Sequence, residues 1–480
     1  MALCAACLIF YNLGSYNPSY DSGVYLESAR MMGRGFSLYR QIFDSQPPLW
    51  LPLIYASFRL FGESVFAGQV VTAIAGLITI VAVMQLTGWV GGTGGAILAG
   101  LLVTLSPLEL QWSRTLNGDV PSVAFSAVSI ALAAGYARNG RRRWLIAAAI
   151  AVTCSILTKL SGVYALPVLT IFVLARWKNS QNRSQWQRLW FAAQDALIVG
   201  GIVFGVTLLA FIWFGPALVW NQAVAFHWAA RSANEVISLH AKFHHLTGLI
   251  AGERLLVITA PLALLCLVSG VDGLALLAWP IFTFAGLVMH YPLYDHHLVA
   301  LIPALAAAIG AGAGQLATVY RVAARWLSAQ SRPFRIVALT ACAGVGMAIF
   351  GIGITQAWRE AAAQLALIQS AGLSSQDLGA VELIVFHSQQ NDMIITDDQG
   401  LAFLADRDVP PGLADTSYTR IGSGYLQPSE VIEQAERHHA RLLLLWSGRL
   451  ASMPEVVQWA DRYFPHRINL AAGRVVYLAK

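Results

Sequence analysis

Residues 65–87 read VFAGQVVTAIAGLITIVAVMQLT and contain no charged side chain. A helix of about 20 apolar residues is long enough to cross the hydrocarbon core of a bilayer. Comparable apolar runs recur along the chain. They predict spanning helices at 2–16, 65–87, 92–110, 119–137, 144–160, 162–177, 195–214, 251–270, 273–290, 297–318 and 334–357. The sequence therefore predicts an all-α polytopic membrane bundle of about eleven transmembrane helices.

The composition supports this class independently of any motif. Of 480 residues, 57% are hydrophobic and only 12% are charged, and the mean hydropathy is +0.59. Soluble domains carry about 45–50% apolar and about 25% charged residues. The net charge of +6 is distributed in short clusters between apolar runs, without a continuous basic stripe. Because a nucleic-acid interface needs such a stripe, we expect no nucleic-acid partner.

The basic clusters predict the orientation in the membrane. Arg and Lys residues concentrate in the segments 138–143, 176–188 and 319–335. With eleven spans, all three lie on one side, and the positive-inside rule assigns that side to the cytoplasm. We therefore expect a multi-pass protein of the plasma (inner) membrane, with its N-terminus cytoplasmic and its C-terminal region extracytoplasmic.

Three predicted outer segments are long enough to carry function: 17–64, 215–250 and the polar tail from 359 to 480. In the tail, residues 393–396, 442–446 and 475–478 have the composition of strands. Residues 428–439 have helical spacing. We predict that 359–480 forms an extracytoplasmic α/β domain, preceded by a transmembrane domain at 1–358.

Several ionisable residues converge on the outer side of this topology. Ionisable groups at helix mouths are costly to bury, so each is a candidate functional residue. Carboxylates near cations suit transfer from a phosphate-linked donor, since one carboxylate can take a proton and a cation can stabilise the departing phosphate. The residues are Asp21, Glu27, Asp44, Asp119, Lys159, Asp295, His296 and His297.

An ordered set of short motifs resembles bacterial GT-C glycosyltransferases, which are relatives of protein O-mannosyltransferases and of lipid A aminoarabinose transferases. The motifs extend over about residues 15 to 310. They are Tyr20-Asp21-Ser22-Gly23-Val24-Tyr25, Leu38-Tyr39, Phe43-Asp44, Pro47-Pro48, Phe61-Gly62, Arg114 through Asp119-Val120-Pro121, Lys159 and Tyr294-Asp295-His296-His297-Leu298.

The resemblance implies a GT-C-like catalytic domain and a polyprenyl-phosphate-linked sugar as donor. The sugar would pass to a glycan, lipid or protein acceptor with inversion at the anomeric carbon, among membrane lipids. It implies catalytic roles for Asp21 and Asp119. Lys159, His296 and His297 would bind the donor phosphate, and Asp44 is a candidate ligand for a divalent metal ion.

This chain departs from the family at two of these positions. Many relatives place an Arg where this chain has Asp295-His296-His297, and a histidine is charged only part of the time near neutral pH. Many also pair two acidic residues where Asp21 is followed by Ser22. The second departure weakens the expectation of a metal.

Each candidate residue also has a purely structural interpretation. Asp21 and Asp119 could cap helices, Asp44 could be a turn residue, and Lys159 could extend to the lipid headgroups. Asp397-Asp398, in the tail, is interpreted as a turn at the end of a strand.

Three other functions remain open from the sequence, one of which is a non-catalytic scaffold whose outer domain binds a glycan or a partner. A secondary transporter would place ionisable groups near the bilayer midplane, on broken helices. A glycan ligase or polymerase would use the same lipid chemistry with a larger glycan.

Overall fold

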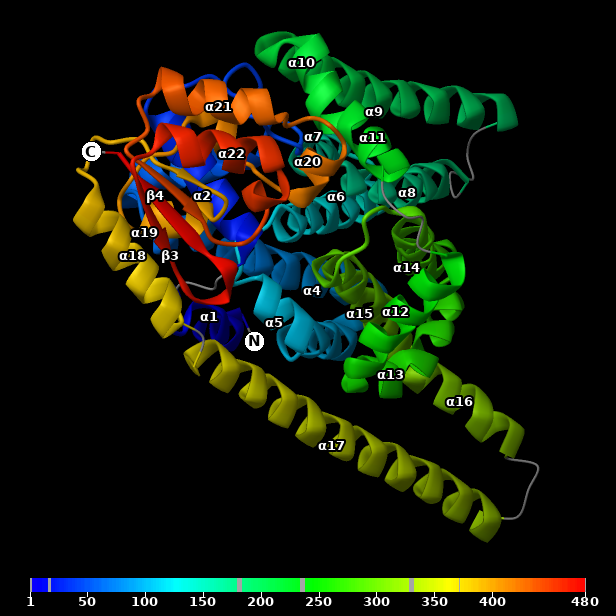
Figure 1. Ribbon diagram of the computed structural model, residues 1–480. Helices are drawn as coiled ribbons and strands as arrows, with labels where there is room; N and C mark the ends of the chain where they lie inside the picture. Colours follow the sequence, from blue (N-terminus) through cyan, green and yellow to red (C-terminus); the bar gives the residue numbers. More distant parts are fainter. Residues whose placement is uncertain are drawn as a thin grey trace.

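The computed structural model describes residues 2–15, 19–178, 184–233, 238–327, 332–370 and 372–479. Most of these residues are helical, and one small sheet lies near the C-terminus (Figure 1). Residues 179–183 and 328–331, which belong to two predicted cytoplasmic segments, lie outside the described residues. So do residues 16–18, where the first predicted span ends and the first predicted outer segment begins.

The helices up to residue 370 form the bundle and the loops between its long helices. Their bounds are α1 Ala2–Phe10, α2 Tyr20–Gly33, α3 Trp50–Phe61, α4 Val65–Thr104, α5 Pro107–Trp112, α6 Asp119–Asn139, α7 Arg142–Thr158, η1 Leu160–Ala165, α8 Leu166–Lys178, α9 Gln185–Phe214, α10 Pro216–Trp220, η2 Asn221–Ala225, α11 Phe226–Ala233, α12 Leu239–Gly252, α13 Arg254–Thr259, η3 Ala260–Ser269, α14 Val271–Met289, η4 Asp295–Ala300, α15 Leu301–Gly314, α16 Leu316–Leu327 and α17 Arg332–Ser370.

The remaining elements belong to the C-terminal region. They are α18 Ser375–His387, β1 Ile395–Thr396, α19 Gln399–Leu404, η5 Pro411–Leu413, α20 Tyr418–Gly422, α21 Pro428–Arg437, β2 Leu442–Leu445, η6 Leu450–Ser452, α22 Pro454–Tyr463, β3 His466–Asn469, η7 Ala471–Gly473 and β4 Val475–Leu478.

Fewer helices than the predicted eleven meet the requirements of a membrane span. In the described part of the chain, six helical stretches are long and apolar enough to cross a membrane, and a bent pair, Leu239–Gly252 with Arg254–Ser269, makes a seventh. The predicted span at 2–16 contains only the short α1, and the predicted span at 251–270 is the bent half of that pair, broken by 92°. Apolar composition alone cannot distinguish these short or broken helices from complete spans.

The predicted span at 65–87 and most of the one at 92–110 lie in a single element, α4, and the end of the second reaches past Thr104 into α5. The 40 residues of α4 are interrupted at Gly92, whose φ of 70° and ψ of −172° are not helical. Glycine adopts a positive φ without a steric penalty, so the chain can turn there and continue as a second helix. The predicted boundary between the two spans therefore coincides with the kink at Gly92, where α4 consists of two helices joined end to end.

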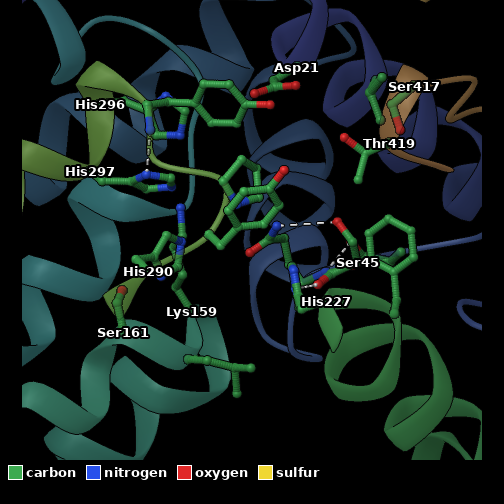
Figure 2. Close-up of a pocket in the computed structure, with 18 of the residues that line it drawn as sticks. Asp21, Ser45, Lys159, Ser161, His227, His290, His296, His297, Ser417 and Thr419 are labelled. Carbon is green, nitrogen blue, oxygen red and sulfur yellow. Dashed lines mark hydrogen bonds between the residues drawn. The ribbon is translucent and has the colours of Figure 1, made fainter. Parts of the chain in front are cut away.

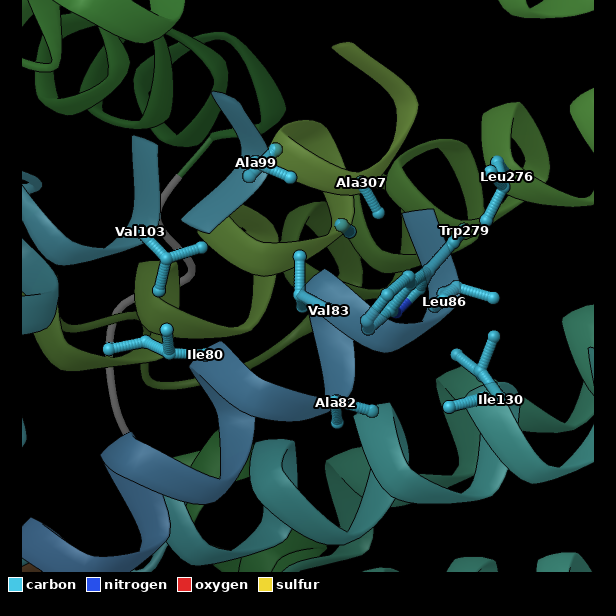
Figure 3. Close-up of a cluster of buried hydrophobic side chains, with 14 of the residues drawn as sticks. Ile80, Ala82, Val83, Leu86, Ala99, Val103, Ile130, Leu276, Trp279 and Ala307 are labelled. Carbon is cyan, nitrogen blue, oxygen red and sulfur yellow. The ribbon is translucent and has the colours of Figure 1, made fainter. Parts of the chain in front are cut away.

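The centre of the bundle is formed by α4, α6, α14 and α15. Figure 3 shows Ile80, Val83 and Leu86 of α4 gathered with Ile130 of α6 and other buried apolar side chains. The sequence LIPALAAAIGAGAG of α15 contains mostly small residues, which allow helix backbones to approach closely without cost. This buried centre holds together the helices whose ends and loops line the cavity described below.

The C-terminal sheet is mixed and has the strand order β1-β2-β4-β3. β1 is parallel to β2, while β4 is antiparallel to both β2 and β3. The three predicted strands and the predicted helix at 428–439 are present as β1, β2, β4 and α21. β3 was not predicted, because its sequence HRIN is exposed throughout and shows no apolar alternation.

Both faces of the sheet are buried at β2, which explains the unbroken apolar sequence LLLL of this strand. Leu443 and Leu445 belong to a core with α21 and α22. Leu442 and Leu444 belong to another core, which also contains residues of α2 and α3. The C-terminal region therefore shares a hydrophobic core with the first outer segment, and Figure 1 shows the red strands beside the blue α2.

Candidate active site

A cavity of about 900 Å³ lies where helix ends of the bundle meet the C-terminal region. Its lining comes from α2, the loop at 43–46, Lys159, α11, the segment 289–297 and residues 415–419 with Arg449. Figure 2 shows His296 and His297 on one side, Ser417 and Thr419 on the other, and Asp21 at the edge between them. Of the six predicted site residues, Asp21, Asp44, Lys159, His296 and His297 line this cavity.

The sixth residue, Asp119, lies directly behind the cavity wall and forms an ion pair with Lys159. The Nζ atom of Lys159 is 2.6 Å from Oδ2 of Asp119. Both side chains are buried, so Lys159 does not extend to the headgroups. An ammonium has three N–H donors, and one of them is used here. The others remain available to an anion in the cavity.

The backbone around Asp119 explains why its carboxylate is free for this pair. Asn117 accepts hydrogen bonds from the backbone N–H groups of Asp119, at 3.0 Å, and Val120, at 3.1 Å. Asn117 therefore performs the capping role that the sequence allowed for Asp119. Lys159 follows the last residue of α7 with extended backbone, φ −154° and ψ 139°, which ends that helix beside the start of α6.

Four histidines are gathered near Lys159. The rings of His296 and His297 lie 4.3 Å apart, and those of His290 and His297 lie 4.4 Å apart. Nδ1 of His297 accepts the backbone N–H of Tyr294 at 3.0 Å. Burial lowers the pKa of His290 to about 4, with the charge of Lys159 as a further cause. Burial also lowers the pKa of His227.

The loss of charge on His290 and His227 changes the expected roles on this wall. A neutral imidazole donates one hydrogen bond and accepts one, but it carries no positive charge. Lys159 therefore supplies a positive charge on this wall that the neutral rings of His290 and His227 do not.

Asp21 is the second residue of α2, after the N-cap residue Ser19. Its side chain is accessible from the cavity but enclosed by protein on the other sides. Within the described part of the chain, no residue donates a hydrogen bond to its carboxylate. Burial raises its pKa to about 6, and the charge of Asp415 raises it further, whereas Lys159 and Arg449 lower it.

Asp44 has one satisfied and one unsatisfied oxygen. Oδ1 accepts the backbone N–H of Gln46 at 2.9 Å, which confirms the turn interpretation. Oδ2 is buried and has no hydrogen-bond partner among the described residues. Burial raises the pKa of Asp44 well above its usual range. A buried oxygen without a partner needs a proton or a ligand to satisfy it.

A group that could hold a metal ion is formed by Asp119, His296 and His297. Their ligand atoms lie within 4.8 Å of one another. Three protein ligands with an open position are typical of catalytic metal sites. Within the described residues, Asp44 is not part of such a group.

The sequence did not identify two site residues of the C-terminal region, Asp415 and Arg449. It also did not single out His290, which follows the last residue of α14, or His227 in the second outer segment. An ionisable residue at a helix end was a usable signal for His290. For Asp415 and Arg449 no local signal exists, since only the tertiary fold places them beside α2.

Comparisons with known proteins give one sequence match and several structural matches. Residues 45–220 match the family model described as dolichyl-phosphate-mannose-protein mannosyltransferase. No curated protein sequence matches the chain.

Solved structures show a similar fold over nearly the whole chain. ArnT from Cupriavidus metallidurans in the apo state superposes with a TM-score of 0.68 at 17% identity, over 99% of this chain and 96% of ArnT. The same protein bound to undecaprenyl phosphate gives a TM-score of 0.67. The Archaeoglobus fulgidus oligosaccharyltransferase in complex with Zn and sulfate gives 0.51 at 14% identity, over 99% of this chain and 72% of the other. The chain therefore has a fold similar to that of ArnT over nearly its whole length, and its residues 45–220 match the mannosyltransferase family model.

Proposed function

We propose that this protein transfers a sugar from a polyprenyl-phosphate donor to an acceptor hydroxyl at the outer face of the membrane. The observation that carries the proposal is the presence, in one cavity, of a buried ammonium on Lys159 and an unbonded carboxylate on Asp21. The structure of ArnT bound to undecaprenyl phosphate supports this class of donor.

In this reaction the Lys159 ammonium holds the donor phosphate through the N–H groups that Asp119 leaves free. The Asp21 carboxylate accepts the proton of the acceptor hydroxyl. The hydroxyl oxygen attacks the anomeric carbon while the bond between that carbon and the phosphate oxygen breaks. Attack on the face opposite the phosphate inverts the anomeric configuration, and polyprenyl phosphate leaves with its electron pair stabilised by Lys159.

Ion pairs that involve the basic loops support the proposed assignment of the two sides of the membrane. Arg138 lies 3.3 Å from Asp272, at the start of α14, and Arg142 lies 3.4 Å from Asp195 of α9. These contacts support a common cytoplasmic side for the helix ends near 138–143. The cavity lies at the opposite ends of α6 and α14, so we assign it and the C-terminal region to the outer face.

A divalent metal is not needed for these steps. Asp119 already has a positive charge 2.6 Å away, on Lys159. A metal bound by Asp119, His296 and His297 would compete with that ammonium for the same carboxylate, and charge repulsion opposes the presence of both. We infer that Lys159 supplies the charge that a metal would otherwise supply.

The test uses the full chain in detergent and synthetic undecaprenyl-phosphate hexoses, mannose among them. Sugar release is compared between wild type, Asp21→Asn and the control Asp461→Asn. The control removes an exposed carboxylate that pairs with Arg467 and lies far from the cavity. We expect release by wild type and the control, and a loss of at least about 10²-fold in Asp21→Asn, because general-base catalysis contributes about 10²–10⁴-fold.

Failure of every lipid-linked hexose with folded wild-type protein would overturn the proposal and favour a transporter. A long lipid-linked glycan that reacts when single hexoses do not would favour the ligase or polymerase alternative.

A further inference from the structure

The first turn of α2, which carries Asp21, is bound to the C-terminal region through Tyr20. The Tyr20 hydroxyl donates to Oδ1 of Asp415 at 3.1 Å and accepts the backbone N–H of Thr416 at 2.8 Å. The guanidinium of Arg449 lies 3.7 Å from the centre of the Tyr20 ring, within the range of a cation–π interaction. Tyr20 is thus held both at its hydroxyl and on its ring.

Asp415 is itself held in place by its own loop. Its Oδ1 also accepts the backbone N–H of Ser417 at 2.7 Å, and its backbone oxygen accepts a hydrogen bond from the buried Arg420 at 2.6 Å. Arg420 donates a further bond to the backbone oxygen of Gly412 at 2.7 Å. The loop that presents Asp415 is therefore fixed by a buried guanidinium.

Arg449 is presented by a second fixed loop. The carboxylate of Asp397 accepts the backbone N–H groups of Trp446 at 2.7 Å, Ser447 at 2.9 Å and Leu450 at 3.1 Å. Arg449 donates to the backbone oxygen of Asp397 at 3.4 Å. Asp397 directly follows β1, where the sequence indicated a turn, and its carboxylate orients the loop that carries Arg449.

A further set of contacts holds the rest of α2 against the same region. Arg30 donates to the backbone oxygens of Phe403 at 3.0 Å and Arg407 at 3.2 Å. A Cβ atom on Gly23 would lie 2.4 Å from the backbone nitrogen of Gly400. The helix that carries Asp21 is therefore packed directly against the C-terminal region.

We propose that Asp415 and Arg449 are positioning residues for Asp21, which act through Tyr20 and make the C-terminal region part of the catalytic unit. The inference rests on the proposed function, in which Asp21 is the general base. Geometry of this kind matters because a misplacement of about 1 Å at a reacting group can cost about 10²-fold in rate.

The two residues also act on Asp21 with opposite signs. The Asp415 carboxylate raises the pKa of Asp21 and the Arg449 guanidinium lowers it. From the bundle, Lys159 lowers that pKa and Asp119 raises it. The hydroxyls of Tyr25 and Tyr294 face the same carboxylate. If the C-terminal region only packed against α2, removing either residue would not shift the pKa of Asp21 in a direction set by its charge. The pH profile therefore distinguishes the proposed role from packing alone.

The first test replaces Tyr20 by Phe, which removes the hydroxyl and keeps the ring under Arg449. The matched control is Tyr477→Phe, because the Tyr477 hydroxyl bonds Asp461 at 2.9 Å in the same region but away from the cavity. With undecaprenyl-phosphate mannose, we expect kcat to fall about tenfold or more in Tyr20→Phe with little change in the donor KM. The control keeps the wild-type kcat. Equal kcat values for Tyr20→Phe and wild type would overturn the inference.

The second test measures kcat/KM against pH. We expect the acid limb to move to lower pH in Asp415→Asn and to higher pH in Arg449→Gln. The control Arg474→Gln removes a guanidinium that lies 3.6 Å from the ring centre of Trp446, outside the cavity, and should leave the limb in place.

The outcomes distinguish this inference from the proposed function. A wild type without sugar release contradicts the proposed function itself. If the wild type is active but the acid limb shifts in the same direction in Asp415→Asn and Arg449→Gln, or in neither variant, the inference alone is contradicted. If Arg449→Gln fails to fold, Arg449→Lys retains the charge and should keep the limb near its wild-type position.

Discussion

The ammonium of Lys159 and the carboxylate of Asp119 form an ion pair of 2.6 Å at the base of the cavity. The two residues are separated by 40 positions in the sequence and are both buried. Removing one partner of a buried pair leaves an uncompensated charge, whereas neutralising both does not. The pair therefore links the stability of the bundle to the charge that is available for the donor phosphate.

Replacing Lys159 by Met should abolish tight binding of the donor phosphate. It should also destabilise the fold by about 3–5 kcal/mol, the usual cost of breaking a buried pair. Binding of undecaprenyl phosphate by the purified variant, measured by calorimetry, and its thermal unfolding in detergent give the two quantities.

The double variant Lys159→Met with Asp119→Asn separates these two effects. It should recover most of the stability, since no unpaired charge remains, and should still fail to bind undecaprenyl phosphate. Wild-type affinity in a stable double variant would place the phosphate elsewhere in the cavity.

The rate of sugar release should depend on pH through Asp21. Its pKa is raised from 3.8 to about 6, and the base must be ionised to accept a proton. Activity is therefore present above this pKa and is lost as the pH falls through about 6, well before an ordinary aspartate would be protonated. A profile of kcat/KM against pH, recorded in detergent, measures this limb. A rate that stays constant down to pH 3.8 would show that Asp21 is not the base.

Gly23→Ala should weaken the contact between α2 and α19. The added methyl would lie 2.4 Å from the backbone nitrogen of Gly400, so one of the two helices has to shift. Overpacking of this kind costs about 1–3 kcal/mol, and here it would also displace Asp21. Thermal unfolding and the kcat for undecaprenyl-phosphate mannose should both decrease.

Gly33→Ala is the matched control in the same helix. A Cβ at Gly33 would lie 3.4 Å from the nearest atom, an oxygen of Glu63, which is an ordinary contact. This variant should keep the activity and stability of wild type. Equal losses in the two variants would contradict the packing explanation, since alanine favours a helix more than glycine does.

Treatment with EDTA should leave sugar release unchanged, because the Lys159 ammonium already neutralises Asp119. Zinc binding, measured by calorimetry, should be stronger in Lys159→Met than in wild type, since that variant frees Asp119, His296 and His297. Loss of wild-type activity in EDTA, with recovery on adding a divalent ion, would contradict this expectation.

Much of the site could be predicted because its residues stand at the ends of apolar segments. Asp119 opens α6, Lys159 ends α7, and His296 and His297 precede α15. Helices that cross the same membrane place their outer ends at one level, so these residues had to lie on one face. The roles of the individual residues could not be predicted as well from the sequence. Asn117 rather than Asp119 caps α6, and the pKa values of His290 and His227 are lowered by burial that the sequence does not reveal.

The sequence by itself determined that the chain is a membrane bundle with a small C-terminal sheet, because hydropathy and its period act locally along the chain. The sequence also predicted that Asp21, Lys159 and His297 lie on the same side of the membrane. Only the tertiary structure decided that Asp415 and Arg449 complete the cavity. Tyr20 and Asp415 are 395 positions apart, and no local pattern records a contact of that length. Their meeting depends on the shared core between α2 and the sheet, where burial of both surfaces stabilises one arrangement.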